Sequence, residues 1–164
     1  MTLDLGLSIA AILILLVCSA FFSGSETALT ATSRARLTEL ERRGSLRARM
    51  VLTLTSMRER LIGALLLGNN VVNISASALA TLVLVRMFGD TGAVIASVIM
   101  TILVLIFGEV LPKTYAIANP DRAALAAAPL VRVIVAVFGP IVMAVEFIVK
   151  QVLRLFGVDI KASQ

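Results

Sequence analysis

An apolar run at residues 93–106 leads into residues 107–113, where a carboxylate, Glu109, falls inside a stretch long enough to cross a bilayer. A charged side chain at membrane depth is energetically costly, so it usually faces a partner, a cavity or an ion path. Pro112 follows three residues later and cannot donate to the helical hydrogen bonding beside it. A buried carboxylate next to a freed backbone carbonyl predicts a place where a cation can be stripped of water.

Long apolar stretches of this kind define the fold class. The chain has 164 residues, of which 59% are hydrophobic, and its mean hydropathy is +1.02. A soluble domain of this length would not carry so much apolar sequence, so we expect an all-α integral membrane protein. The predicted transmembrane spans cover residues 5–32, 61–88 and 93–118. A tight turn at residues 88–92 makes the last two spans antiparallel neighbours.

The chain contains no histidine, which limits the chemistry it can support. Serine or cysteine triads that use a histidine base are excluded, as are most zinc sites. An intramembrane enzyme would have to rely on Glu26 or Glu109 alone. We therefore expect a protein that is not an enzyme.

Residues 33–60 form the main polar segment, and its charge predicts the orientation of the chain. Eight arginines outnumber three glutamates here, an excess of five that equals the net charge of the whole chain. The positive-inside rule places this segment in the cytoplasm, with the N-terminus outside and the C-terminus cytoplasmic in the inner (plasma) membrane. Because no aromatic residues are interleaved with the charges, short helices on anionic membrane lipid are favoured over nucleic-acid binding.

Residues 123–156 are apolar but interrupted by two prolines, and two arrangements are open for them. A fourth crossing would put the C-terminus outside. The alternative is a bent juxtamembrane helix that lies along the inner face of the membrane. Glu146, Lys150 and Arg154 recur every four residues and give one polar stripe, which favours the interfacial helix.

Each predicted span carries an oxygen-bearing side chain at the same depth. Counted from the inner boundaries, Ser23, Asn69 and Glu109 each lie about nine residues in, or roughly 13 Å at the rise of an α-helix. Asn73 lies one turn from Asn69 and shares its helix face. A proline four residues after Gly108 frees the Gly108 carbonyl to bind a cation.

These groups are hard oxygen ligands, which suit Mg²⁺, Ca²⁺ or Na⁺ and not soft metals. A single carboxylate predicts weak, reversible binding, as transport requires. Structural roles are open alternatives: polar residues can serve as contacts between helices, Glu109 can pair with Lys113 one turn away, and Glu26 can meet an arginine of the basic segment. The second tier of candidates is Ser25, Glu26, Asn70, Pro112 and Lys113.

Three motifs together resemble the transmembrane domain of the cyclin M / CorC family of magnesium transporters. They are Phe22-Ser23-Gly24-Ser25-Glu26-Thr27-Ala28, Gly68-Asn69-Asn70-Val71-Val72-Asn73 and Gly108-Glu109-Val110-Leu111-Pro112-Lys113. Their order, their spacing and the basic loop also match, and the resemblance covers essentially the whole chain. It implies a homodimer in which each chain has three crossings and a juxtamembrane helix. It also implies that the protein exports Mg²⁺ in exchange for Na⁺.

The resemblance also assigns roles by motif position. The family's ion ligands fall on Ser23, Asn69, Asn73 and Glu109. Its helix break falls on Gly108 and Pro112. Family members usually continue into cytoplasmic CBS modules that sense nucleotides, so we expect this chain to be truncated and ATP to act only through a region absent from it. The alternative to a transporter is a membrane anchor or Mg²⁺ sensor that uses the same site without moving ions.

Overall fold

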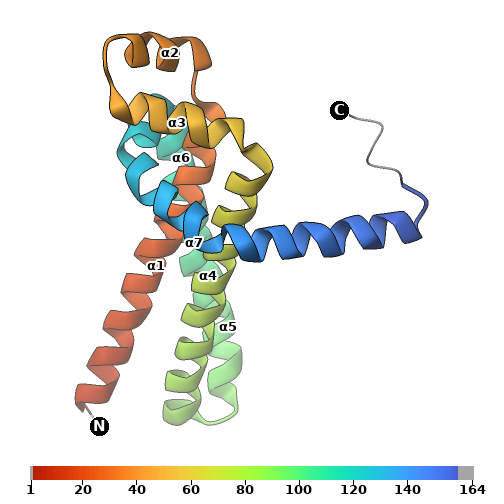
Figure 1. Ribbon diagram of the computed structural model, residues 1–164. Coiled ribbons are helices and arrows are strands. Elements are labelled where there is room, and N and C mark those ends of the chain that lie inside the picture. The colour runs from red at the N-terminus through yellow and green to blue at the C-terminus, as the bar shows by residue number, and fades with distance from the viewer. Residues whose placement is uncertain (1, 159–164) are drawn as a thin grey trace.

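The computed structural model describes residues 2–158, and this part of the chain is almost entirely helical, with no strand (Figure 1). The prediction of an all-α membrane protein is therefore confirmed at the level of secondary structure. In chain order the elements are α1 (Thr2–Ala31), α2 (Arg34–Arg42), α3 (Leu46–Ser56), α4 (Arg58–Phe88), α5 (Thr91–Leu103), the π-helix η1 (Val104–Val110), α6 (Leu111–Ala118) and α7 (Pro120–Leu155).

An apolar bundle is formed by α1, α4 and the path of α5, η1 and α6. Helix α1 packs against α4, η1 and α6, while α4 packs against α5. Large apolar side chains cover its outside: Leu13, Val17 and Ile74 are 56%, 70% and 69% exposed. Such an exposed apolar surface is suited to contact with lipid. Among the described residues four helices, α7 included, are long and apolar enough to span a membrane, so these criteria alone do not give the predicted three crossings.

The turn between α4 and α5 depends on two glycines. Gly89 ends α4 with a φ of 65°, a conformation that L side chains rarely adopt. Gly92 lies directly against the Leu84 backbone, where a Cβ atom would collide with the Leu84 carbonyl. These close approaches produce the tight turn and the antiparallel pair that the sequence predicts.

The third predicted span differs in detail from the sequence prediction. The sequence predicts a helix break at Pro112, but the backbone remains helical from α5 through η1 into α6, with Pro112 in the first turn of α6. In η1 the turns are widened, so that the Leu111 N–H bonds to the Ile106 carbonyl, five residues back. This π-helical spacing accommodates a residue without an N–H group while the chain continues in the same direction.

The basic segment forms two short helices, α2 and α3, at one end of the bundle (Figure 1). Leu37 of α2 and Val51 and Leu54 of α3 are buried, while the arginines of both helices are exposed. Ser45 caps α3, since its Oγ accepts a hydrogen bond from the Ala48 N–H at 3.2 Å. Each helix therefore turns an apolar face inward and its cationic face outward.

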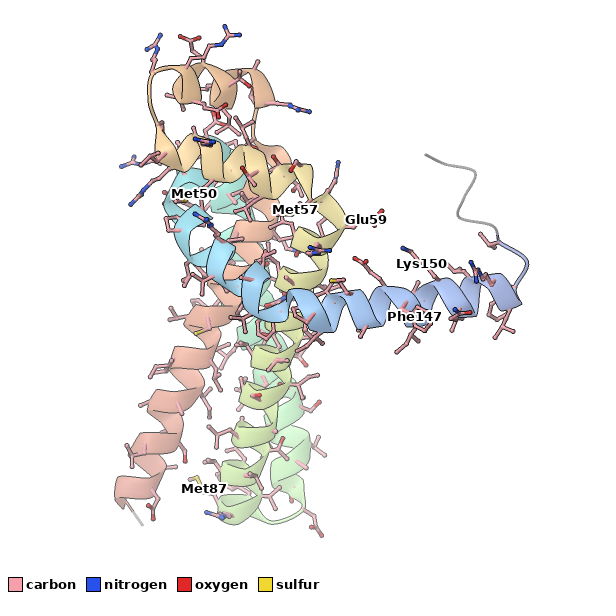
Figure 2. The ribbon with its side chains drawn as sticks, in the orientation of Figure 1. Met50, Met57, Glu59, Met87, Phe147 and Lys150 are labelled. Atoms are coloured by element: carbon pink, nitrogen blue, oxygen red, sulfur yellow. The ribbon has the colours of Figure 1, made fainter. Side chains whose placement is uncertain are left out.

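Helix α7 has two halves with different surroundings. Its buried residues all lie between Ala124 and Val142, where it packs on α1, α3 and α4. The rest of α7 extends away from the bundle, across the direction of α1 and α4 (Figure 1). Figure 2 shows Lys150 on the side of the basic helices and Phe147 on the opposite side. The polar stripe predicted from the sequence is therefore one face of an amphipathic helix.

Candidate cation site

Ser23, Asn69 and Glu109 come together inside the bundle from α1, α4 and η1. Ser23 Oγ donates to Glu109 Oε2 at 3.0 Å, and Asn69 Nδ2 donates to Glu109 Oε1 at 2.9 Å. Ser23 has no exposed surface and Asn69 is 7% exposed. Counting residues along the sequence places these three side chains at a common depth. In the structure they make direct contacts that join three elements.

A second set of hydrogen bonds orients the Asn69 amide. Ser19 Oγ donates to Asn69 Oδ1 at 3.0 Å, and Asn73 Nδ2 approaches the same oxygen at 3.4 Å. The Asn73 Oδ1 atom is buried and has no hydrogen-bond partner among the described residues. A buried carbonyl oxygen without a donor is energetically unfavourable. This oxygen is therefore a ready ligand for a cation.

Lys113 also reaches the carboxylate, because its Nζ lies 3.1 Å from Glu109 Oε2. The pairing that the sequence left open is therefore present. It coexists with the hydrogen bonds from Ser23 and Asn69, so the carboxylate is held from α1, α4 and α6 at once. The Lys113 ammonium is itself a cation in contact with the Glu109 carboxylate, and another cation would have to displace it or share the carboxylate.

Two glycines let the helices approach each other at this level. A Cβ atom on Gly108 would lie 2.8 Å from Ser19 Oγ, and one on Gly68 would collide with the Phe22 ring. Gly108 is buried next to Glu109 in η1, where the backbone hydrogen-bond spacing is altered. Its backbone carbonyl as an ion ligand stays a prediction.

Apart from Lys113, the second-tier residues lie around the site without joining its hydrogen bonds. Ser25 is buried on α1, whereas Asn70 points outward and is exposed. Glu26 forms no ion pair within residues 2–158, so its predicted meeting with an arginine is not observed. Pro112 has a packing role, since its Cβ lies 3.4 Å from where a Cβ on Gly24 would be.

A groove of about 680 Å³ reaches the site along α4 and α5. Glu109 and Asn73 form part of its lining, although the unpaired Asn73 Oδ1 atom itself is buried. The groove continues along a row of hydroxyl groups on the two helices. These are the side chains of Ser77, Thr81, Ser97 and Thr101.

The chemistry of the site is that of one carboxylate with neutral oxygen donors. Among the described residues there is no cluster of three or more His, Cys, Asp or Glu side chains. Carboxylate, amide and hydroxyl oxygens favour hard cations, and Mg²⁺ usually keeps several of its waters when so few protein oxygens are available. The arrangement can hold a cation without surrounding it completely.

The sequence that forms this helical bundle matches a known family. The model of the cyclin M transmembrane N-terminal domain matches residues 10–164. The chain belongs to this family. A relative from Escherichia coli K12, the UPF0053 inner membrane protein YfjD, is 40% identical over 140 residues, which cover 85% of this chain and 33% of that protein. This cyclin M domain is accordingly a multi-pass inner membrane protein.

Two further relatives come from Haemophilus influenzae. A UPF0053 protein is 34% identical over 149 residues, which cover 91% of this chain and 36% of that protein. A polyamine export protein is 29% identical over 172 residues, which cover 97% of this chain and 40% of that protein. This cyclin M domain therefore spans about a third of the length of the two UPF0053 relatives.

One residue of the network, Ser19, was missed by the sequence analysis. It is completely buried and holds the Asn69 amide in place. The available signal was its position four residues before Ser23, which puts both hydroxyls on one face of α1. Ser19 lies outside the conspicuous polar motif that begins at Ser23, and a lone serine in an apolar run is usually a helix contact.

Proposed function

We propose that this cyclin M domain transports Mg²⁺ across the inner membrane, with Glu109 as the central ligand. The observation that carries the proposal is the Glu109 carboxylate, half-buried at mid-bundle and contacted by Ser23 and Asn69. An ionisable side chain in this setting marks an ion path more often than a structural contact. The unpaired Asn73 Oδ1 supplies a further ligand within the same network.

Lys113 gives the site a state without a bound ion. Its ammonium balances the Glu109 charge, which would otherwise be exposed to a low-dielectric surrounding. When Mg²⁺ enters, Lys113 withdraws and the Asn69 amide turns its oxygen toward the ion. The same oxygens accept Na⁺, so inward Na⁺ flow through this site would drive Mg²⁺ export. No enzymatic step is part of this proposal.

For the topology we propose three crossings, with α7 lying along the inner surface. Its C-terminal half extends away from the bundle instead of running beside it (Figure 1), and Lys150 and Phe147 point to opposite sides (Figure 2). A helix with one charged and one apolar face is suited to the membrane interface. The positive-inside rule then places the N-terminus outside and the basic segment with the C-terminus in the cytoplasm.

We also propose that two copies of the chain pair across the groove along α4 and α5. Its hydroxyl-bearing side chains Ser77, Thr81, Ser97 and Thr101 would otherwise line a lipid-facing surface. Small polar residues at such positions are typical of contacts between transmembrane helices. A second copy would cover the groove and leave a polar path toward Glu109.

The first test is a calorimetric titration of the purified protein with Mg²⁺, with Ca²⁺ and Na⁺ as competitors. Saturable binding by the wild type that is lost in Glu109→Ala supports the site. The matched control is Glu146→Ala, which removes a carboxylate from α7 at a distance from the bundle centre and should bind as the wild type does. Wild-type affinity in Glu109→Ala would refute the assignment.

A second candidate substrate is a polyamine. A relative is named a polyamine export protein, and the contact between Lys113 Nζ and Glu109 shows that an alkylammonium fits against this carboxylate. A terminal ammonium of a polyamine could take the place of Lys113. Titrations of the wild type with spermidine and with Mg²⁺ separate the two candidate substrates, because the substrate should bind more tightly. This difference in affinity should disappear in Glu109→Ala.

The anchor or sensor alternative uses the same site but moves no ion. Liposomes that contain the protein and a trapped Mg²⁺ indicator distinguish the two. A transporter gives Mg²⁺ flux that depends on Glu109, whereas a sensor binds Mg²⁺ without flux.

A further inference from the structure

A recess of about 810 Å³ lies between α3 and α7, apart from the candidate cation site. Its floor is apolar and includes three methionines, Met50, Met57 and Met143. Figure 2 shows Met50 on α3 and Met57 at the C-terminal end of this helix, on the side of the bundle that carries the basic helices. Methionine side chains adapt to irregular and flexible ligands. The recess can therefore accept an apolar chain of variable shape.

Three arginines from three different helices line the same recess. They are Arg49 of α3, Arg60 of α4 and Arg132 of α7. Within residues 2–158 none of them forms an ion pair, although Arg36 and Arg43 do pair with nearby carboxylates. The recess thus concentrates three uncompensated cations next to an apolar surface. Arginine is well suited to hold a phosphate through several hydrogen bonds.

We propose that this recess binds an acidic phospholipid, with the phosphate on the three arginines and one acyl chain against the methionines. A cavity of this size exceeds what a phosphate group alone would fill, and its remaining lining is apolar. The recess also lies where α7 turns away from the bundle, close to Gly139 and Pro140. The lipid would join α3 to α7 and fix the angle at which α7 leaves the bundle.

The test compares two triple variants that carry the same charge. In the recess variant Arg49, Arg60 and Arg132 are changed to Gln; in the control Arg42, Arg47 and Arg122, which lie outside this recess, are changed to Gln. Each variant lowers the net charge from +5 by three, to +2. The purified proteins are titrated with phosphatidylglycerol or phosphatidylcholine in mixed micelles, and bound lipid is counted by native mass spectrometry.

We expect the recess variant to bind phosphatidylglycerol about tenfold more weakly than the control variant, because it loses direct phosphate contacts in addition to surface charge. Phosphatidylcholine should bind weakly to both. Equal losses in the two variants would show a diffuse attraction to the charged surface and would overturn the proposal. Displacement of the lipid by millimolar inorganic phosphate would overturn it as well, because the acyl chain would then contribute nothing.

A steric variant tests the apolar part of the site without changing any charge. Ala136 lines the recess, whereas its neighbour Val137 is exposed on another face of α7. Ala136→Trp should fill the recess and reduce retention of phosphatidylglycerol about tenfold or more, while Val137→Trp should retain it. Unchanged retention in Ala136→Trp would show that the acyl chain does not lie in the recess.

Discussion

Asn69 donates from Nδ2 to Glu109 Oε1 across 2.9 Å, which joins α4 to η1 over 40 positions of the sequence. The other end of the same amide, Oδ1, accepts from Ser19. An amide held at both ends has a defined orientation, and rotation about its terminal bond exchanges donor and acceptor. Asn69 can therefore compensate the carboxylate in the absence of an ion and present an oxygen when a cation is bound.

The first prediction follows from this exchange. Asn69→Ala removes both a donor to Glu109 and a potential ligand, so Mg²⁺ affinity should fall about tenfold or more in a calorimetric titration. Asn70→Ala is the matched control, because the adjacent amide is exposed and outside the network. Equal effects of the two substitutions would contradict a special role for Asn69.

The second prediction concerns Ser19, which touches the amide and not the carboxylate. Ser19→Ala removes the hydrogen bond that orients Asn69, and loss of such a supporting contact typically lowers metal affinity about tenfold. The control is Ser75→Ala, since Ser75 is exposed on α4 and lies outside the groove that reaches the site. Thermal unfolding should be followed in parallel. If Ser19→Ala lowers stability and leaves Mg²⁺ affinity unchanged, Ser19 has only a packing role.

The sequence predicted much of the site because the membrane imposes a common scale on the three spans. Counting from the polar boundaries placed Ser23, Asn69 and Glu109 at one depth, and the structure brings these three side chains into contact. Counting could not give the rotation of each helix about its axis. That rotation decides that Asn69 points inward and Asn70 outward, and it depends on how Gly68 packs against α1.

Two features of the fold were beyond sequence reasoning for a related reason. Pro112 indicates disturbed hydrogen bonding, but it does not say whether the chain breaks or widens into π-helical turns, as η1 does. Helix α7 has the length and composition of a membrane span as well as an amphipathic stripe. Its course depends on packing such as that of Val142 on Gly63, where a Cβ atom would come within 2.6 Å of the Val142 Cγ1.

The third prediction tests the packing between α1 and α4 at Gly68. Gly68→Ala would push a Cβ atom into the Phe22 ring, and overpacking of this kind costs roughly 1–3 kcal/mol. We expect a lower unfolding temperature in detergent for Gly68→Ala. The double variant Phe22→Leu with Gly68→Ala should recover part of the loss because the smaller side chain makes room. Gly6→Ala serves as the control, since nothing lies within 4 Å of its Cβ position.

The fourth prediction concerns Lys113, whose ammonium competes with an incoming cation for Glu109. Lys113→Met keeps the length of the side chain and removes its charge, so Mg²⁺ no longer has to displace an ion pair. A partly exposed pair of this kind contributes about 1 kcal/mol, which corresponds to roughly fivefold tighter Mg²⁺ binding in the variant.

The matched control for Lys113 is Lys150→Met, which removes the same charge from the exposed end of α7. Its Mg²⁺ affinity should equal that of the wild type if long-range electrostatics contribute little. Tighter binding in Lys113→Met alone would identify Lys113 as an internal competitor of the ion. Weaker binding would instead show that Lys113 positions the Glu109 carboxylate for the ion, and the proposed displacement of Lys113 would be wrong.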